Sequence, residues 1–314
     1  MKYAEESRRE NLTLVTEFIL LGLPNHRELE VPLFFIYLLI YAITLIGNIL
    51  LIIITVAPTL QTPMYFFLRI LSFLDVCYTS VTIPKMLVNF LSEDKSISYL
   101  GCTVQMYFLL FLGASECFLL ATMAYDRYVA ICNPMRYRVI MNRRVCFSLA
   151  FLSWFGGNLL SIVQTTWLHF CGPNQISHYI CELPALLQLS CTVNLFNQVV
   201  LLTSILILGS GALLLTLVSY IHIISTILRI RSAEDRHKAF STCSSHLIVV
   251  GLFYLTGFIQ YTKPSSVSSV VIDEMLSIQY SILTPMLNPI IYSLKNKEVK
   301  MALGKILIKF KSPR

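Results

Sequence analysis

The sequence predicts an all-α membrane protein, built as a bundle of seven transmembrane helices. Of its 314 residues, 56% are hydrophobic and only 13% are charged, and the mean hydropathy is +0.70. A water-soluble core does not account for that balance. Uncharged runs also recur along the chain, and a helix of about 20 apolar residues crosses about 30 Å of hydrocarbon. The recurrence of these runs therefore predicts several membrane spans.

Seven apolar runs are the predicted spans. They cover residues 33–57, 63–91, 99–131, 145–168, 196–228, 239–262 and 275–294. The uncharged run that ends the fifth span, residues 183–228, is 46 residues long. As one helix it would measure about 69 Å, which is too long for a single crossing. We therefore expect a loop that includes Pro184 and residues 191–194 before the fifth span.

Lysine and arginine are distributed unequally between the two sides of these spans. With the N-terminus outside, 17 of the 24 basic residues fall on the inner side, where membrane proteins concentrate positive charge. The triplet Asn11-Leu12-Thr13 is a glycosylation acceptor that must also face outward. We therefore expect an extracellular segment at residues 1–30, a transmembrane domain at 31–294 and a cytoplasmic tail at 295–314. Because the first residues are polar, we expect the first span, rather than a cleaved signal peptide, to direct insertion.

Several function classes are excluded or disfavoured by the sequence. The net charge of +7 does not indicate nucleic-acid binding, because the basic residues lie between apolar spans and form no stripe with aromatic residues. An enzyme is not predicted, since GxSxG and HExxH motifs are missing and no nucleophile and base share a helical spacing. A channel or transporter would predict internal repeats or a polar ring lining a pore, and the sequence has neither.

Four of the nine cysteines lie in segments predicted to be outside, where oxidation is favoured. They are Cys102, Cys171, Cys181 and Cys191. Four cysteines allow three disulfide connectivities, and the residues alone do not choose among them or exclude free thiols. A zinc site is less favoured because His169 and His178 lack the regular spacing of zinc ligands.

Two carboxylates, Asp75 and Glu116, interrupt the second and third spans. We expect Asn48 and Asn288 to face the same interior space. Burying an isolated ionised carboxylate is costly, so the pair should share either a cation or a proton. The hypothesis is a sodium site formed by Asp75, Glu116 and Asn288, and the alternative is a protonated, hydrogen-bonded pair. No cofactor is required beyond this possible allosteric ion.

Lysines alternate with apolar residues after the seventh span. The lysines are Lys295, Lys297, Lys300, Lys305 and Lys309, and the apolar residues are Val299, Leu303, Ile306, Leu307 and Phe310. This pattern predicts a short amphipathic eighth helix that lies on the anionic lipid of the inner leaflet, and the alternative is a solvated tail.

An ordered set of motifs runs along nearly the whole chain. It follows Asn11 and comprises VTEFILLGL at 15–23, GN at 47–48, PMYFFL at 63–68, MAYDRYVAIC at 123–132, SY at 219–220, KAFSTCSSHL at 238–247 and PMLNPIIY at 285–292. With these motifs the chain resembles the odorant receptors of the tetrapod-enriched class, a branch of the rhodopsin-like G-protein-coupled receptors. Two positions depart from the family pattern: Gln61 stands where a histidine is frequent, and Leu255 replaces the glycine that usually follows the tyrosine of the sixth span.

The resemblance implies a plasma-membrane receptor that binds a small odorant outside and activates a heterotrimeric G protein of the olfactory, stimulatory type, which raises cAMP. A receptor of the same fold for an endogenous metabolite in another tissue is the alternative. The resemblance also implies disulfides between Cys102 and Cys181 and between Cys171 and Cys191, which would tie the second exterior loop over the binding cavity.

Arg127 lies at the inner end of the third span and stays charged at all physiological pH values. We expect it to pair with Asp126 at rest and to be offered to a partner when helices separate. The resemblance implies that the sixth helix moves outward and opens a groove for the C-terminal helix of the G protein. Tyr128, Tyr220 and Tyr292 stand at matching inner positions. A plain anchor of positive charge is the alternative. The rim of the G-protein groove is expected at Arg136, Arg138, Arg143, Arg144 and residues 229–238.

The ligand cavity is expected in the outer half of the bundle, with apolar walls and few polar groups. Helical steps outward from Arg127 place candidates on the third, fifth, sixth and seventh spans, each of which could instead pack or face lipid. They are Met106, Leu109, Leu110, Gly113, Ala114, Ser204, Ile205, Leu208, Tyr254, Gly257, Phe258, Tyr261, Ile278 and Ser281. None of the five third-span candidates is ionisable, so we predict neutral ligands over acids and amines, with Ser204, Ser281 or a tyrosine hydroxyl orienting one oxygen. Burial of about 300 Å² of apolar ligand contributes roughly 7 kcal/mol before association entropy, which predicts micromolar to millimolar affinity.

Overall fold

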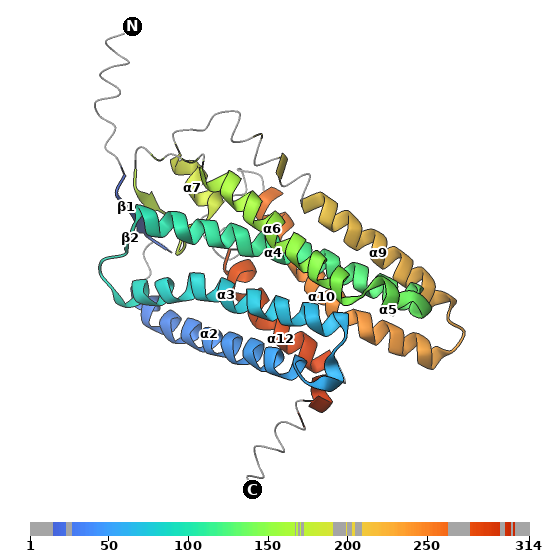
Figure 1. Cartoon of the computed structure of the whole chain (residues 1–314). Helices are drawn as coiled ribbons and strands as arrows, with labels where there is room; N and C mark the ends of the chain where they lie inside the picture. The colour runs from blue at the N-terminus through green and yellow to red at the C-terminus, as the bar shows by residue number, and fades with distance from the viewer. Residues whose placement is uncertain are drawn as a thin grey trace.

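The computed structural model of the chain describes residues 15–22, 27–166, 168, 170, 173–190, 199, 203–204, 209–262, 277–295, 299–302 and 304. Long helices run side by side in one bundle, with a small sheet at one end (Figure 1). The long elements are α2 (Arg27–Thr55), α3 (Pro63–Leu91), α4 (Tyr99–Cys132), α6 (Arg143–Thr166), α9 (Ser210–Arg229), α10 (Ala233–Thr262) and α12 (Thr284–Lys295). The short helices are η1 (Pro58–Leu60), η2 (Pro134–Arg136), α5 (Tyr137–Ile140), α7 (Leu183–Leu189) and the π-helical turn η5 (Gln279–Leu283).

Within the described residues, six helices are long and apolar enough to cross a membrane. They correspond to the first six predicted spans. The seventh predicted span is represented by residues 277–295, which are helical throughout because η5 continues directly into α12. The described part of the fifth span begins with α9, and most of its predicted outer part lies outside the described residues. The architecture is therefore the predicted seven-helix bundle.

Two helices begin a full turn or more before the predicted spans. The first begins at Arg27 rather than at residue 33, and the sixth at Ala233 rather than at residue 239. The prediction rested on uncharged runs, which mark only the part of a helix that lies in hydrocarbon. Charged turns extend these helices beyond that part, and Glu234 and Asp235 in the first turn of α10 also complement the helix dipole.

One contact between α2 and α12 shows how the bundle satisfies a backbone group inside the apolar region. Pro289 lies within α12 and has no N–H, so the carbonyl of Pro285 lacks its usual helical partner. The side-chain amide of Asn48 donates to that carbonyl at 3.1 Å, and Asn48 is fully buried. Gly47 permits this approach, because a Cβ atom there would lie 3.0 Å from the Pro289 ring. The glycine–asparagine pair in α2 thus compensates the proline in α12.

A three-stranded sheet covers one end of the bundle, which we call the disulfide end; the sequence did not predict it (Figure 1). The central strand β1 (Glu17–Leu20) pairs antiparallel with β2 (Ser96–Ser98) and parallel with β3 (Gln175–Ile176). Phe18 and Leu20 of β1 are buried in a separate apolar cluster with Cys102 and Cys181. Residues 17–20, which precede the first helix, therefore belong to the folded sheet at the disulfide end.

The opposite end of the bundle carries Arg127, the loop helix α5 and the start of α10, and we call it the Arg127 end. Residues 299–302, after α12, are helical there as well. Val299 is fully buried in the main apolar cluster, whereas Lys300 is exposed. This burial pattern supports the predicted amphipathic eighth helix over a solvated tail.

Candidate functional site

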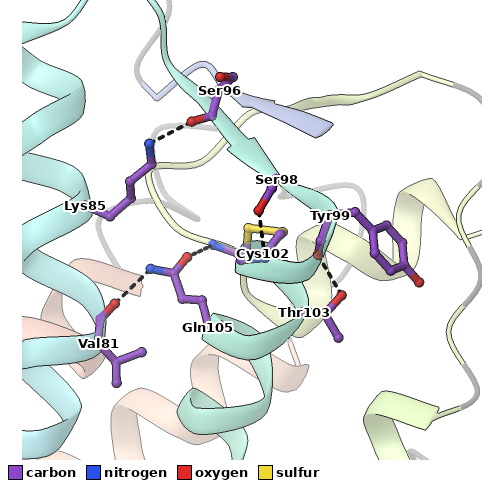
Figure 2. The surroundings of a disulfide bond; sticks show 10 residues. Val81, Lys85, Ser96, Ser98, Tyr99, Cys102, Thr103 and Gln105 are labelled. Carbon is purple, nitrogen blue, oxygen red and sulfur yellow. Dashed lines mark hydrogen bonds between the residues drawn. A yellow bond between two sulfur atoms is a disulfide. The ribbon is translucent and has the colours of Figure 1, made fainter. Parts of the chain in front are cut away.

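The disulfide end is fastened by a covalent bond and by polar contacts around it (Figure 2). Cys102 of α4 and Cys181 of the loop before α7 form a disulfide across 79 residues of sequence, which is the pairing that the resemblance implied. Gln105, one turn further along α4, donates to the carbonyl of Val81 in α3 and accepts from the backbone N–H of Cys181, both at 2.9 Å. The loop is thus fixed to two helices. Cys171, Cys191 and Asn11 lie outside the described residues.

Lys85 falls within the second predicted span, residues 63–91, but its side chain contributes to the disulfide end. Its ammonium group donates to the carbonyl of Ser96 in β2 at 2.7 Å (Figure 2). The long side chain carries the charge from α3 to the loop that follows it. Lys85 therefore holds the loop that contains β2 against α3, and it is not an isolated intramembrane charge.

A small, partly open pocket of about 10 Å³, the space of roughly one water molecule, lies beneath this loop. Its walls come from α3, from the loop between β3 and α7, and from the start of the last helix. The lining residues are Met86, His178, Tyr179, Ile180, Ser277, Ile278, Ser281 and Ile282. Ile278 and Ser281 were predicted from the sequence, and the other six were missed. The signal that was available is proximity to Cys181, since the residues just before a tethered loop cysteine must lie over the bundle.

The other predicted ligand residues are placed differently. On α4, Met106, Leu109 and Gly113 are buried, Leu110 and Ala114 are half-buried, and none of them lines this pocket. Met106 and Leu110 pack beneath the sheet, whereas Leu109 belongs to the main apolar cluster.

The predicted residues of the fifth and sixth spans are only partly described. Ser204 accepts a hydrogen bond from the Gln164 amide at 3.1 Å. The Tyr254 hydroxyl donates to the Cys117 carbonyl at 3.4 Å, and Gly257 is half-buried in the same helix. Ile205, Leu208 and the side chains of Phe258 and Tyr261 lie outside what the structure describes.

The middle of the bundle holds the predicted polar cluster. Asn288 donates to both carboxylate oxygens of Asp75, at 3.0 and 3.1 Å, and both residues are buried. Glu116 is also buried, and its charge interacts with that of Asp75. Three buried oxygens of this cluster have no hydrogen-bond partner among the described residues, namely Asn48 Oδ1, Glu116 Oε1 and Asn288 Oδ1. In the described part of the chain, no group of three or more histidine, cysteine or acidic side chains is arranged to hold a metal.

These unpartnered oxygens fit a small hard cation, because such ions prefer carboxylate and amide oxygens as ligands. A proton shared by the two carboxylates would provide a hydrogen bond for a carboxylate oxygen. It would leave the amide oxygens of Asn48 and Asn288 without a donor. Both alternatives from the sequence therefore remain compatible with the cluster.

At the Arg127 end, the charges of Asp126 and Arg127 interact, as expected for a pair at rest. The ion pairs found within 4.0 Å among the described residues do not include these two side chains. Asp126 instead accepts a hydrogen bond from the hydroxyl of Tyr137 at 2.8 Å. Tyr137 belongs to α5, and its burial, followed by the Asp126 charge, raises its pKa above the ordinary value. The loop helix thus supplies a direct hydrogen bond to the carboxylate beside Arg127.

A second contact at this end joins α9 and α10. The hydroxyl of Tyr220 and Nδ1 of His246 lie 2.6 Å apart, and their rings stack. Both side chains are buried, as is Tyr292, whose hydroxyl has no hydrogen-bond partner in the part of the chain that is described. Sequence reasoning selected Tyr220 and Tyr292 but missed Tyr137 and His246. A histidine inside an apolar span was the available signal for the latter, because a buried imidazole needs a partner.

Exposed basic side chains surround the buried Arg127. Among the rim residues predicted from the sequence, Arg136 and Arg138 on the loop helices and Arg143 and Arg144 at the start of α6 are exposed. Arg229 at the end of α9 is exposed as well. Tyr128, next to Arg127, packs its ring against His222 of α9, with 5.7 Å between the ring centres.

The comparisons with known proteins agree with this arrangement. The family model described as olfactory receptor matches residues 37–310 of the chain. The human olfactory receptor 10A7 is 52% identical over 95% of this chain and 96% of its own length. The dog olfactory receptor-like protein OLF1 is 49% identical over 93% of this chain and 95% of its own length.

Among solved structures, squid rhodopsin superposes with a TM-score of 0.72 at 18% identity, covering 89% of this chain and 85% of the rhodopsin chain. That likeness concerns the fold alone. The motifs, the helix bundle and the matches along nearly the whole length lead to one conclusion: the chain belongs to the olfactory receptor family of rhodopsin-like G-protein-coupled receptors.

Proposed function

We propose that this olfactory receptor binds small, neutral, mostly apolar odorants at the disulfide end and activates a stimulatory, olfactory-type G protein at the Arg127 end, which raises cAMP. The observation that carries the proposal is the pairing of two features at opposite ends of one bundle. One is a largely apolar pocket under a disulfide-tethered loop. The other is a buried arginine within a rim of exposed basic side chains.

The pocket supports the ligand class through its chemistry. Met86, Ile180, Ile278 and Ile282 supply apolar walls beside the polar side chains of His178, Tyr179, Ser277 and Ser281, a combination that suits a mostly apolar ligand with a polar group. Apolar burial of about 300 Å² at about 25 cal/mol/Å² contributes roughly 7 kcal/mol, from which association entropy removes several kcal/mol. We therefore infer affinities on the order of micromolar to millimolar.

The Arg127 end supports coupling to a G protein. Tyr220 and His246 hold α9 against α10 beside Arg127. When α10 moves outward, this contact separates and the guanidinium becomes available to an acceptor on the G protein. The basic rim then favours an acidic or carboxyl-terminated partner segment by electrostatic attraction.

For membrane placement, we propose a multi-pass protein of the plasma membrane with residues 1–30 outside, the receptor domain at 31–294 and the tail at 295–314 inside. The excess of lysine and arginine on the Arg127 side supports this orientation. We propose that Asn11 is glycosylated and that Cys171 and Cys191 form a second disulfide outside.

For the polar cluster, we propose that Asp75, Glu116 and Asn288 hold a sodium ion that favours the inactive state. The buried oxygens of Glu116 and Asn288 that lack partners among the described residues support it. A bound cation would supply the positive charge that balances two carboxylates in an apolar environment. Asn288 donates to both carboxylate oxygens of Asp75, which links α3 to α12.

A cAMP reporter screen of volatile compounds in cells that express the receptor tests the proposed function. We expect neutral alcohols, esters, ketones or phenols to be the best agonists, and we expect Arg127→Ala to abolish the response while the receptor still reaches the cell surface. Acids or amines as the best agonists, or an unchanged response of Arg127→Ala, would overturn it.

A further inference from the structure

A ridge of four exposed side chains runs along one side of α6, one at every fourth position. They are Arg143 in the first turn, Phe147, Phe151 and Phe155. Residues four apart are neighbours on a helix surface, and the rings of Phe151 and Phe155 stack with 6.0 Å between their centres. Because α6 is long and apolar enough to cross the membrane, these exposed rings face hydrocarbon. Arg143 therefore stands where the ridge reaches the edge of the bilayer at the Arg127 end.

The aromatic part of the ridge has the length of one lipid chain within a leaflet. From Phe147 to Phe155 the helix rises about 12 Å, since each residue adds about 1.5 Å. One leaflet contributes about half of the hydrocarbon core, or roughly 15 Å. The Phe147 ring also packs edge-on against Phe66 of α3, with 4.9 Å between the ring centres. A single acyl chain can therefore lie along these rings while its headgroup meets Arg143.

The headgroup level of this ridge carries positive charge. Arg144 is exposed beside Arg143, and Arg138 on α5 is exposed as well. The first turn of α6 has no acidic residue, and the ion pairs found within 4.0 Å in the described part of the chain involve none of these arginines. Asn142 joins the two helices, because its amide donates to a carbonyl of α5 at 3.0 Å and accepts from an N–H in the first turn of α6 at 3.1 Å. The basic side chains thus belong to one well-fixed segment.

Charge and position together select the headgroup. A guanidinium group presents a planar fork of N–H donors that matches two phosphate oxygens. Every phospholipid has a phosphate, but in phosphatidylcholine a quaternary ammonium group cancels its charge. Near a membrane surface, each basic residue favours acidic over neutral lipid by about 5-fold. The arginines at the end of the ridge therefore favour a lipid with a net negative charge.

We propose that the end of α6 at Arg143 is a binding site for an acidic phospholipid of the phosphatidylserine type. The acyl chain packs along the three phenylalanines of the ridge, and the headgroup pairs with Arg143 and Arg144. The proposal goes beyond the proposed receptor function, and the proposed orientation makes the acidic inner leaflet the source of the lipid. Arg143, which the sequence placed on the rim of the G-protein groove, then contacts the bilayer.

Quenching of tryptophan fluorescence by brominated lipid measures which lipids touch the ridge. Phe147→Trp places a reporter on the ridge, and the signal of the two native tryptophans is subtracted with the unsubstituted receptor. The receptor, without G protein or odorant, is reconstituted in phosphatidylcholine nanodiscs that contain a fixed fraction of either brominated phosphatidylserine or brominated phosphatidylcholine. One or two arginines predict a preference for phosphatidylserine of about 5-fold to 30-fold.

A second reporter position is the matched control. Phe147 and Phe35 of α2 are both 62% exposed, but the residue four positions before Phe35 is Val31, not an arginine. Phe35→Trp should therefore report a preference close to one. This comparison separates a site at α6 from a general enrichment of acidic lipid around a basic protein.

Charge variants in the Phe147→Trp receptor identify the binding group. Arg143→Gln should lower the preference by about 5-fold, whereas Arg136→Gln should leave it unchanged, because Arg136 lies in η2 and outside the ridge. Salt at 1 M should also lower the preference, since it shortens the Debye length to about 3 Å. If Arg143→Gln does not fold, the salt titration and Arg144→Gln test the same charge.

Equal quenching by the two lipids at the ridge, the same preference at the α2 control, or a preference that Arg143→Gln leaves unchanged would each overturn the site. So would a neutral sterol that removes the quenching by both lipids equally, because the site would then recognise an apolar surface alone. Failure of the proposed receptor function would silence the cAMP screen and leave the lipid preference intact. Failure of the lipid site would abolish the preference and leave odorant-evoked cAMP in place.

Discussion

The contact between Asn48 and the carbonyl of Pro285 leads to a prediction about stability. Asn48→Ala removes the donor from a carbonyl that Pro289 cannot serve, at a position where Asn48 is fully buried. A buried acceptor left without a partner costs about 1–3 kcal/mol, and side-chain hydrogen bonds between membrane helices average about 0.6 kcal/mol. We therefore expect a loss of about 1–2 kcal/mol, which corresponds to a fall in melting temperature of roughly 2–8 °C.

The assay is thermal unfolding of the purified receptor in lipid nanodiscs, arranged as a double-mutant cycle. Pro289→Ala restores a backbone N–H four residues after Pro285. In that background, Asn48→Ala should therefore lower the melting temperature clearly less than in the unsubstituted receptor. Asn89→Ala is the matched control, because Asn89 is a buried asparagine whose amide atoms have no partner among the described residues. Two results would refute the reasoning. One is an equal fall in melting temperature for Asn48→Ala in the Pro289→Ala background and in the unsubstituted receptor. The other is a fall for Asn48→Ala that is no larger than the fall for Asn89→Ala.

Three further predictions concern other contacts. Gln105→Ala should lower the melting temperature by a few degrees and weaken odorant potency, because the tethered loop loses its link to α3; unchanged dose–response curves in the cAMP assay would contradict this. Tyr137→Phe frees Asp126 to pair with Arg127, so basal cAMP should fall by up to about 10-fold, and a rise would contradict the assignment. Asp75→Asn should abolish the dependence of basal activity on sodium concentration in isolated membranes; wild-type activity that is already independent of sodium, and that Asp75→Asn leaves unchanged, would count against the ion.

The transmembrane helices could be predicted from the sequence because the bilayer imposes a length and an apolar composition on each of them. The small sheet could not be predicted, since its strands span only two to four residues and their pairing joins three separate loops. Such short strands carry no reliable periodicity. Their pairing depends on how the loops are held together in the folded chain, including the loop that the Cys102–Cys181 disulfide tethers.

The candidate site was predictable to different degrees at the two ends. Asp75, Glu116 and Asn288 could be grouped from the sequence, because intramembrane polar groups must find one another. The pocket could not, because its loop wall depends on where the disulfide holds His178 and Ile180. Stepping along α4 by helical turns finds an inward face, but it does not tell which part of that face packs and which part lines a cavity.

The partner of Asp126 was missed for a related reason. Adjacency in sequence suggested Arg127, but neighbouring residues on a helix point in different directions. Tyr137 comes from a short loop helix whose position depends on packing against α4. Local sequence therefore identified the charged groups, whereas tertiary structure determined their partners.

The account depends most on the claim that the pocket and Arg127 open to opposite sides of the membrane. Staining of epitope tags at the two termini of the receptor in cells measures this directly. The N-terminal tag should bind antibody on intact cells, and the C-terminal tag should bind only after permeabilisation. Detection of both tags on the same side would contradict the seven-span receptor.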